Sequence, residues 1–142
     1  MVSIINALTP IDGVLTGGQP TQEQLQDAKE LGFKTIINLR GVGEAGTDVE
    51  PGIVANLGMA YHHLPINGAA GITFENAEAF GRLMDASDGP IMVHCASGNR
   101  VGALFAIKSY RVDGASAEDA LALGYRAGLT GLQGYVRQLL DV

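Results

Sequence analysis

Hydrophobic residues along the chain fall into short uninterrupted runs, separated by longer stretches in which they recur every three or four positions. The short runs are rich in apolar and β-branched residues and are too short for helices. Such runs are typical of strands buried in a largely parallel sheet. They predict strands within GVLTGG (13–18), FKTIINLR (33–40), MAYHHLPI (59–66) and PIMVHC (90–95).

The longer stretches predict helices, and residues suited to helix ends mark where they begin and stop. Thr21 and Gln24 have the spacing of a capping box, and Thr73 and Ser116 are suited to N-cap positions. Gly128 is suited to a helix end. The predicted helices cover 21–32, 51–57, 74–86, 99–112, 116–128 and about 130–140.

Strands alternate with helices through about the first hundred residues, and helices close the chain. This order predicts an α/β fold with a central, largely parallel sheet of four to five strands and helices on both faces. A length of 142 residues without repeats or linkers favours a single domain over residues 1–142. Ligands of such sheets bind beyond the carboxyl ends of the strands, where Cys95 is expected to lie.

The net charge of −6 argues against nucleic acid or an anionic membrane surface as a partner, since both require clustered Lys and Arg. An anionic substrate remains compatible, because a local pocket can oppose the overall charge. MVSIINALTP has neither a basic segment nor a long apolar one, so no signal peptide and no transmembrane segment are expected. With a single cysteine and no internal disulfide, a cytoplasmic location is expected.

The candidate chemistry lies in HCASGNR, where the only cysteine follows a strand and precedes a helix. A loop that turns into a helix N-terminus directs backbone N–H groups toward one point, which favours an anion such as a thiolate or a phosphate. Arg100 adds a planar fork of donors that matches phosphoryl oxygens. We therefore predict Cys95 as the nucleophile and Arg100 as its catalytic partner. The predicted phosphate-binding residues are Ala96, Ser97, Gly98, Asn99 and Arg100.

Other residues are expected to support this loop. A lone cysteine is more often a small buried hydrophobic residue, and the nucleophile interpretation depends on its neighbours. Adjacent strand residues point to opposite faces, so His94 is expected to orient the loop or tune the thiol from behind. Arg40, at the end of a strand, is expected either to hold an anion or to pair with Glu44.

The run VHC followed by a glycine loop and an arginine resembles the signature of the cysteine-dependent protein tyrosine and dual-specificity phosphatases. The segments GVLTGGQPTQEQLQDAKELGFKTIINLR, LGMAYHHLPI and DGASAEDALALGYRAGL extend the likeness over nearly the whole chain. The chain is most similar to the bacterial beta-lactamase-hydrolase-like group, whose domain is phosphatase-like.

The resemblance implies a dual-specificity-phosphatase-like fold and a phosphoric monoester hydrolase. In that family's mechanism Cys95 would attack phosphorus, Arg100 would bind the transferring oxygens, and water would hydrolyse a phosphocysteine. The implied substrate is an anionic, phosphorylated small molecule or protein, and no cofactor is implied.

The spacing departs from the phosphatase signature, which has five residues between Cys and Arg where this chain has four. Rhodanese-like sulfurtransferases often use the shorter loop, although the beta-lactamase-hydrolase-like group also tends to have it. A persulfide carried on Cys95 is therefore the alternative chemistry. The hydroxyl residue that follows the family's arginine is also replaced, by Val101.

The general acid of these phosphatases has no counterpart in the matching stretch, LPINGAAGIT, which offers Asn67 and no carboxylate. The remaining candidates are Glu44 and Asp48, in the glycine-rich loop GVGEAGTDVE. A chain with no acid would also suit a non-catalytic phosphate- or oxyanion-binding module. His62 and His63 would point to opposite faces of a strand, so no metal site is predicted.

Overall fold

The computed structural model describes residues 2–142 and confirms the α/β fold. Its elements are β1 (Leu8–Ile11), β2 (Val14–Gly17), α1 (Gln22–Glu30), β3 (Thr35–Asn38), α2 (Glu50–Asn56), β4 (Ala60–His63), η1 (Gly68–Gly71), α3 (Phe74–Ala86), β5 (Ile91–His94), α4 (Asn99–Arg111), α5 (Ala117–Ala127) and α6 (Gln133–Leu140). The sheet has five strands in the order β1-β2-β5-β3-β4. All neighbours are parallel except β1, which pairs antiparallel with β2 at the edge.

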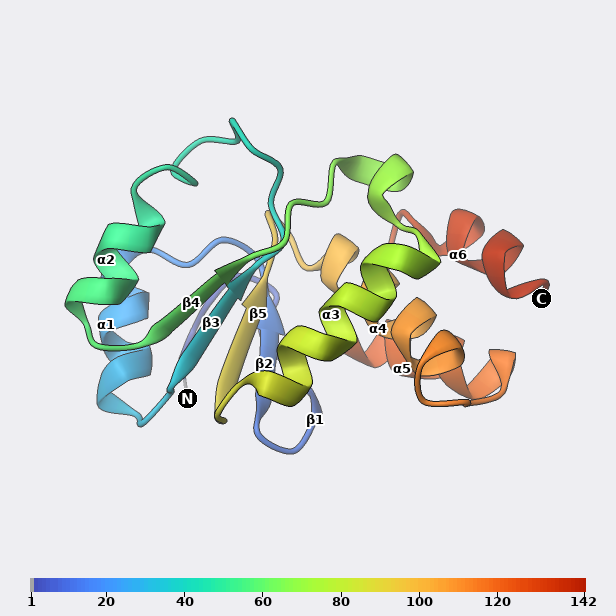
Figure 1. Ribbon diagram of the computed structural model, residues 1–142, viewed down its shortest axis with the longest axis horizontal. Helices are drawn as coiled ribbons and strands as arrows, with labels where there is room; N and C mark the ends of the chain where they lie inside the picture. Colours follow the sequence, from blue (N-terminus) through green and yellow to red (C-terminus); the bar gives the residue numbers. More distant parts are fainter. Residues whose placement is uncertain (1) are drawn as a thin grey trace.

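Helices cover both faces of the sheet, with α1 and α2 on one side and α3 to α6 on the other (Figure 1). The two faces form separate cores, and β5 contributes to both because its side chains alternate. Val93 belongs to the core under α3 to α6, whereas Met92 belongs to the core under α1 and α2. His94 and Cys95 therefore continue this alternation at the end of the strand and point to opposite faces.

The predicted strands and helices are all present, with ends displaced by a few residues. Thr21 forms the expected capping box with Gln24, and Thr73 and Ser116 cap α3 and α5. No helix within residues 2–142 combines the length and the apolar character needed to cross a membrane.

Two parts of the fold differ from the sequence prediction. Strand β1 was not predicted, because it contains Pro10 and is largely exposed, and it lies at a sheet edge where proline is tolerated. Helix α6 begins at Gln133 rather than near residue 130. The Asn99 side chain accepts hydrogen bonds from the N–H groups of Thr130 (2.9 Å) and Leu132 (3.1 Å), which holds this segment as a turn.

The central helix α4 packs so closely against the α5 region that it requires glycine at the contact. A Cβ atom at Gly102 would lie 2.0 Å from the backbone nitrogen of Leu129. A backbone atom cannot swing aside as a side chain does, so only glycine permits this approach. The contact positions the turn after α5 beside the start of α4, where the loop that follows β5 ends.

We expect Gly102→Ala to lower the free energy of unfolding by about 1–3 kcal/mol, because the added methyl group overpacks a backbone contact. Gly134→Ala in α6 is the matched control, since nothing lies within 4 Å of its Cβ position. The control should be neutral or raise stability by up to about 1 kcal/mol, because alanine favours helix. Urea unfolding followed by circular dichroism measures both variants. Equal stabilities would contradict the packing argument.

Candidate active site

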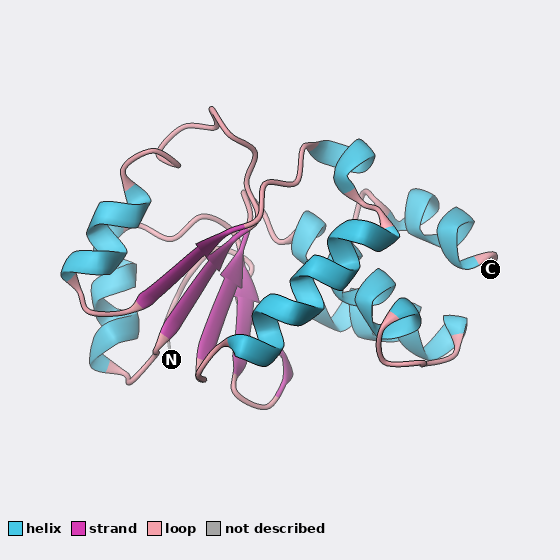
Figure 2. Cartoon of the chain, viewed as in Figure 1, coloured by secondary structure: helices cyan, strands magenta, loops and turns pink. Residues whose placement is uncertain are grey.

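The candidate site lies where the strands of the sheet end and their loops gather (Figure 2). Cys95 directly follows β5, and Arg100, five positions later, lies in the first turn of α4. The loop between β3 and α2 carries Arg40 and Glu44 to the same edge, and the loop after β4 brings Ile66. The sheet thus places all three loops around one short segment.

The backbone of this segment has its carbonyl groups bonded to the surrounding scaffold. The Cys95 oxygen lies 3.2 Å from His94 Nδ1, and the other three carbonyls accept from N–H donors. These acceptor–donor pairs are Ala96 with the Gln19 backbone (3.1 Å), Ser97 with Asn6 Nδ2 (2.8 Å) and Gly98 with the Gly102 backbone (3.0 Å). The N–H groups of Ala96, Ser97, Asn99 and Arg100 have no hydrogen-bond partner within residues 2–142. They are free to bind an anion, and the N-terminal end of α4 favours negative charge at this point.

Cys95 is fully buried, yet its sulfur meets a backbone donor. The N–H of Gly98 points at Cys95 Sγ across 3.1 Å. Gly98 adopts a φ of 99°, a left-handed conformation that glycine tolerates best, and this turns its N–H back toward the sulfur. A donor aimed at sulfur stabilises a thiolate more than a thiol.

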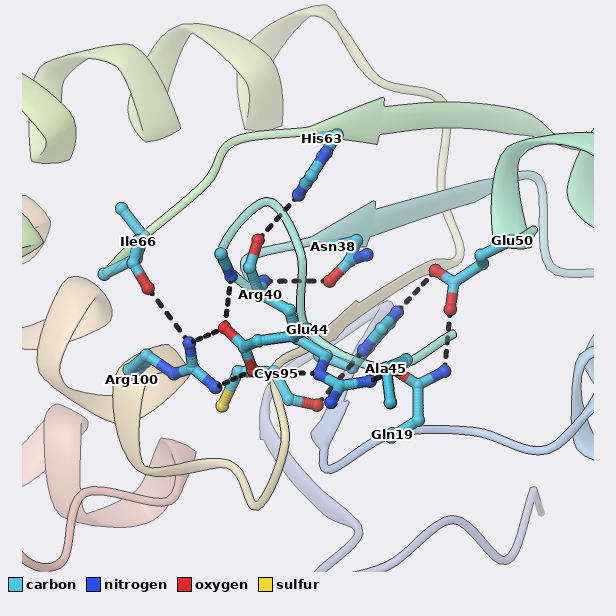
Figure 3. Close-up of polar contacts among 12 residues, drawn as sticks. Gln19, Asn38, Arg40, Glu44, Ala45, Glu50, His63, Ile66, Cys95 and Arg100 are labelled. Atoms are coloured by element: carbon cyan, nitrogen blue, oxygen red, sulfur yellow. Dashed lines mark hydrogen bonds and ion pairs between the residues drawn. The ribbon is translucent and has the colours of Figure 1, made fainter. Parts of the chain in front are cut away.

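Arg100 turns inward and forms a two-pronged ion pair with Glu44 (Figure 3). Arg100 Nη1 donates to Glu44 Oε2 at 2.6 Å, and Nη2 donates to Oε1 at 2.9 Å. Nη1 also donates to the Ile66 carbonyl at 2.9 Å. The hydrogen bonds from Arg100 to Glu44 raise the pKa of the guanidinium against the effect of burial, and a charge on Cys95 adds to the rise. The arginine is therefore held as a cation close to the sulfur.

Glu44 also receives hydrogen bonds from its own loop. The Gly41 N–H and Arg40 Nε both donate to its carboxylate, the latter at 3.1 Å. The bonds from Arg100 are the largest cause of a lowered pKa, about 2, and they outweigh desolvation. Of the two roles expected for Arg40, the structure shows the pairing with Glu44. A carboxyl group that is ionised at neutral pH has no proton to donate, so this arrangement does not suit Glu44 as a general acid.

The other residues predicted for the site differ in how far they are buried in the protein. His94 is fully buried on the face of the sheet opposite to Cys95, as expected from strand alternation. Asp48 is exposed and forms no hydrogen bond or ion pair within residues 2–142. The structure therefore does not bring Asp48 to the loop. Ala96 and Ser97 are exposed, and Asn99 is half-buried.

Two residues at the site were not predicted, Gln19 and Glu50. Glu50 begins α2 and is only 2% exposed, with its Oε2 atom 2.6 Å from His94 Nε2. Gln19 Nε2 donates to Glu50 Oε1 at 2.7 Å, and Arg40 Nη1 donates to Gln19 Oε1 at 2.8 Å. Glu50 precedes a proline at a helix start, a place where an acidic residue usually interacts with the helix dipole at the surface. That pattern gives no signal of burial.

No group of three His, Cys, Asp or Glu side chains that could hold a metal ion lies within the described part of the chain. His63 instead contacts the backbone, with Nε2 2.6 Å from the Arg40 carbonyl oxygen. This contact braces the start of the loop that carries Glu44.

The sheet order and the cysteine loop at the end of β5 define the cysteine-dependent phosphatase fold of the tyrosine and dual-specificity type. A family model described as "DSP-PTPase phosphatase fused to NAD+ Kinase" matches residues 11–131, and the chain belongs to this family. The predicted resemblance to the beta-lactamase-hydrolase-like group is also confirmed. The Beta-lactamase hydrolase-like protein of Xylella fastidiosa is 34% identical over 116 residues, covering 78% of this chain and 26% of that protein. The chain thus spans about a quarter of the length of the curated relatives it matches.

Solved structures agree on the fold. A Neisseria meningitidis protein provisionally named a phosphatase superposes with a TM-score of 0.75 at 20% identity, over 92% of this chain and 96% of that one. TpbA of Pseudomonas aeruginosa, solved in complex with phosphotyrosine, superposes with a TM-score of 0.66 at 16% identity, over 96% and 91% of the two chains. At these identities the matches establish the architecture.

The ion pair between Glu44 and Arg100 should make stability depend on pH. The lowered pKa of Glu44 stabilises the fold above the ordinary value of 4.5, and this contribution is lost as the pH falls toward about 2. We expect Glu44→Gln to reduce the free energy of unfolding by about 1–3 kcal/mol near neutral pH, with the difference from wild type shrinking in acid. Urea unfolding at about pH 6 and about pH 3 measures this. Asp48→Asn, in the same loop, should differ little from wild type at either pH, and a Glu44→Gln deficit that persists in acid would contradict the assignment.

Proposed function

We propose that this chain is a phosphoric monoester hydrolase of the tyrosine or dual-specificity type, acting through a phosphocysteine on Cys95. The observation that carries the proposal is the loop from Cys95 to Arg100. It has four N–H groups without a partner among residues 2–142, an N–H donor on the sulfur and a fixed guanidinium beside it. Membership of a phosphatase family supports the same chemistry.

The proposed reaction has two displacements at phosphorus. The Cys95 thiolate attacks phosphorus, the bond from phosphorus to the ester oxygen breaks, and the alcohol departs after taking a proton from solvent. Water then attacks the phosphocysteine, the P–S bond breaks, and inorganic phosphate leaves with the thiolate restored. In both transition states the charge on the equatorial oxygens is stabilised by the loop N–H groups and by Arg100.

Glu44 leaves part of the Arg100 fork available for this role. The carboxylate receives hydrogen bonds from Nη1 and Nη2, while Nε has no partner among residues 2–142. A phosphoryl oxygen can therefore bind at the Nε edge without displacing Glu44. The ion pair fixes the plane of the guanidinium before substrate arrives, which reduces the entropy lost on binding.

Two further functions are each favoured by one observation. The spacing of four residues between Cys95 and Arg100 favours a sulfurtransferase in which Cys95 carries a persulfide. An ionised Glu44 and an exposed Asp48 leave the site without a positioned acid, which favours a non-catalytic oxyanion-binding module.

We infer a single domain over residues 1–142 that acts in the cytoplasm on phosphorylated small molecules or proteins rather than on nucleic acid or membranes.

The first functional prediction separates these three possibilities. Purified protein incubated with p-nitrophenyl phosphate should release phosphate, and Cys95→Ser should abolish the release because a hydroxyl is a far weaker nucleophile than a thiolate. A parallel incubation with thiosulfate and cyanide should yield no thiocyanate. Thiocyanate formation lost in Cys95→Ser would instead identify a sulfurtransferase. Inactivity in both assays with phosphate binding retained in calorimetry would identify a binding module.

The second functional prediction concerns the leaving group. Without a general acid, expulsion of the ester oxygen should depend strongly on its basicity, since acid assistance is worth roughly 10²–10⁴ in rate. We expect kcat for p-nitrophenyl phosphate to exceed kcat for phenyl phosphate by at least about a hundredfold. Asp48→Asn should leave this ratio unchanged. A ratio near one in the wild type, rising in Asp48→Asn, would identify Asp48 as the acid.

A further inference from the structure

His94 lies behind the catalytic loop with an oxygen acceptor against each ring nitrogen. Nε2 is 2.6 Å from Glu50 Oε2, and Nδ1 is 3.2 Å from the Cys95 carbonyl oxygen. A neutral imidazole has one donor and one acceptor nitrogen, so it could satisfy only one of these oxygens. Both contacts become hydrogen bonds when Nδ1 carries a proton and a second proton lies between Nε2 and Glu50.

Glu50 is buried against His94 and has a hydrogen-bond partner on its other side. It is 2% exposed, at the start of α2, and its other carboxylate oxygen accepts from Gln19 Nε2 at 2.7 Å. Its charge contributes to the raised pKa of Tyr61, although desolvation of that phenol is the larger cause. A buried carboxylate without a partner is costly, so the contact with His94 is what makes Glu50 tolerable at this position.

The same contacts connect the two ends of the catalytic loop (Figure 3). From the Cys95 carbonyl, an unbroken series of polar contacts leads to the guanidinium at the other end of the loop. Its members, in order, are His94, Glu50, Gln19, Arg40, Glu44 and Arg100. The series passes through the loop between β3 and α2, so this loop supports the nucleophile as well as the arginine.

We propose that Glu50 is a positioning residue for the nucleophile, acting through His94. With a proton shared between Glu50 and Nε2, Nδ1 donates to the Cys95 carbonyl and fixes the first peptide of the loop. In a planar trans peptide the C=O and N–H point in opposite directions. Holding the Cys95 carbonyl toward His94 therefore keeps the Ala96 N–H pointing away from His94. The proposal rests on the proposed function of Cys95 as a nucleophile, and Glu50 touches no substrate.

The main test measures Cys95 directly, by its rate of alkylation with iodoacetamide from about pH 5 to pH 9. Gln19→Glu combined with Glu50→Gln places a carboxylate at position 19, so the amide at position 50 donates to it and turns its oxygen toward Nε2. Nε2 must then carry the proton of the neutral ring, so Nδ1 should lose its donor role. We expect alkylation near neutral pH to slow by about tenfold, the rise in rate to move to higher pH, and kcat for p-nitrophenyl phosphate to fall more than KM changes. Alkylation equal to wild type across the pH range would overturn the proposal.

The single variant Glu50→Gln is the matched control. Gln19 Oε1 accepts from Arg40 Nη1, so Gln19 Nε2 faces position 50 and the amide oxygen of Glu50→Gln accepts from it. The amide N–H then donates to His94 Nε2, and Nδ1 keeps its donor role. We expect Glu50→Gln to alkylate near the wild-type rate. A loss as large as in the double variant would show that the direction of the hydrogen bond to His94 does not matter, and would overturn the proposal.

A third variant separates loss of the Nδ1 donor from loss of folding. His94→Asn supplies an amide donor in reach of the Cys95 carbonyl, whatever residues stand at positions 19 and 50. Adding Gln19→Glu and Glu50→Gln to His94→Asn should therefore slow alkylation no further, whereas an additional tenfold loss would overturn the proposal. Because alkylation needs no phosphate ester, its dependence on Glu50 can be established even if the wild type hydrolyses none. That result would refute the proposed function and leave the positioning role supported.

Discussion

The candidate site depends on where the carbonyl groups of one short loop are bonded. Four consecutive carbonyls, from Cys95 to Gly98, lie within hydrogen-bond distance of nitrogen atoms of the scaffold, from His94, Gln19, Asn6 and α4. Because these acceptors are satisfied elsewhere, the loop can keep N–H groups unpaired at the end of a sheet without leaving its carbonyls orphaned. An anion then completes the hydrogen bonding of the loop. In the proposed function these unpaired donors bind the phosphoryl oxygens, while the N–H of Gly98 donates to the Cys95 sulfur.

This constraint explains why so many polar groups are buried around one loop. Glu50 and His94 lie on the α1 and α2 side of the sheet, while Cys95 lies on the α3 to α6 side. A hydrogen bond that fixes the loop from behind must therefore come from the opposite core, where a polar side chain requires a partner of its own. Glu50 is that partner for His94, and Gln19 is in turn the partner for Glu50. Each buried polar group thus requires a further polar partner, and the series of contacts ends at Arg40 and Glu44, which are partly exposed.

The sequence predicted the fold and the central loop well, because both leave local signals. Apolar runs marked the four parallel strands, the Thr21 capping box marked α1, and the spacing of Cys95, Gly98 and Arg100 marked the site. Glu50 and Gln19 left no such signal, since their contacts join residues 31 and 44 positions apart, and only the fold brings these together. Glu44 was predicted as a candidate acid from its residue type and its loop. Its distance to Arg100, which makes it an ionised partner instead, is a tertiary property.

Electrostatics limits how the proposed active site could attract a phosphate ester. The Arg100 charge is opposed by Glu44 at hydrogen-bond distance, and the Arg40 charge is opposed by the same carboxylate. With a thiolate on Cys95, the two guanidinium groups are balanced by the two anions Cys95 and Glu44, so these side chains leave no net positive charge. Under the proposed function, attraction of a phosphate dianion must then come mainly from oriented dipoles, the loop N–H groups and the start of α4, which act over short distances. Such a site would select ligands by the fit of their oxygens to fixed donors, which is compatible with a net charge of −6.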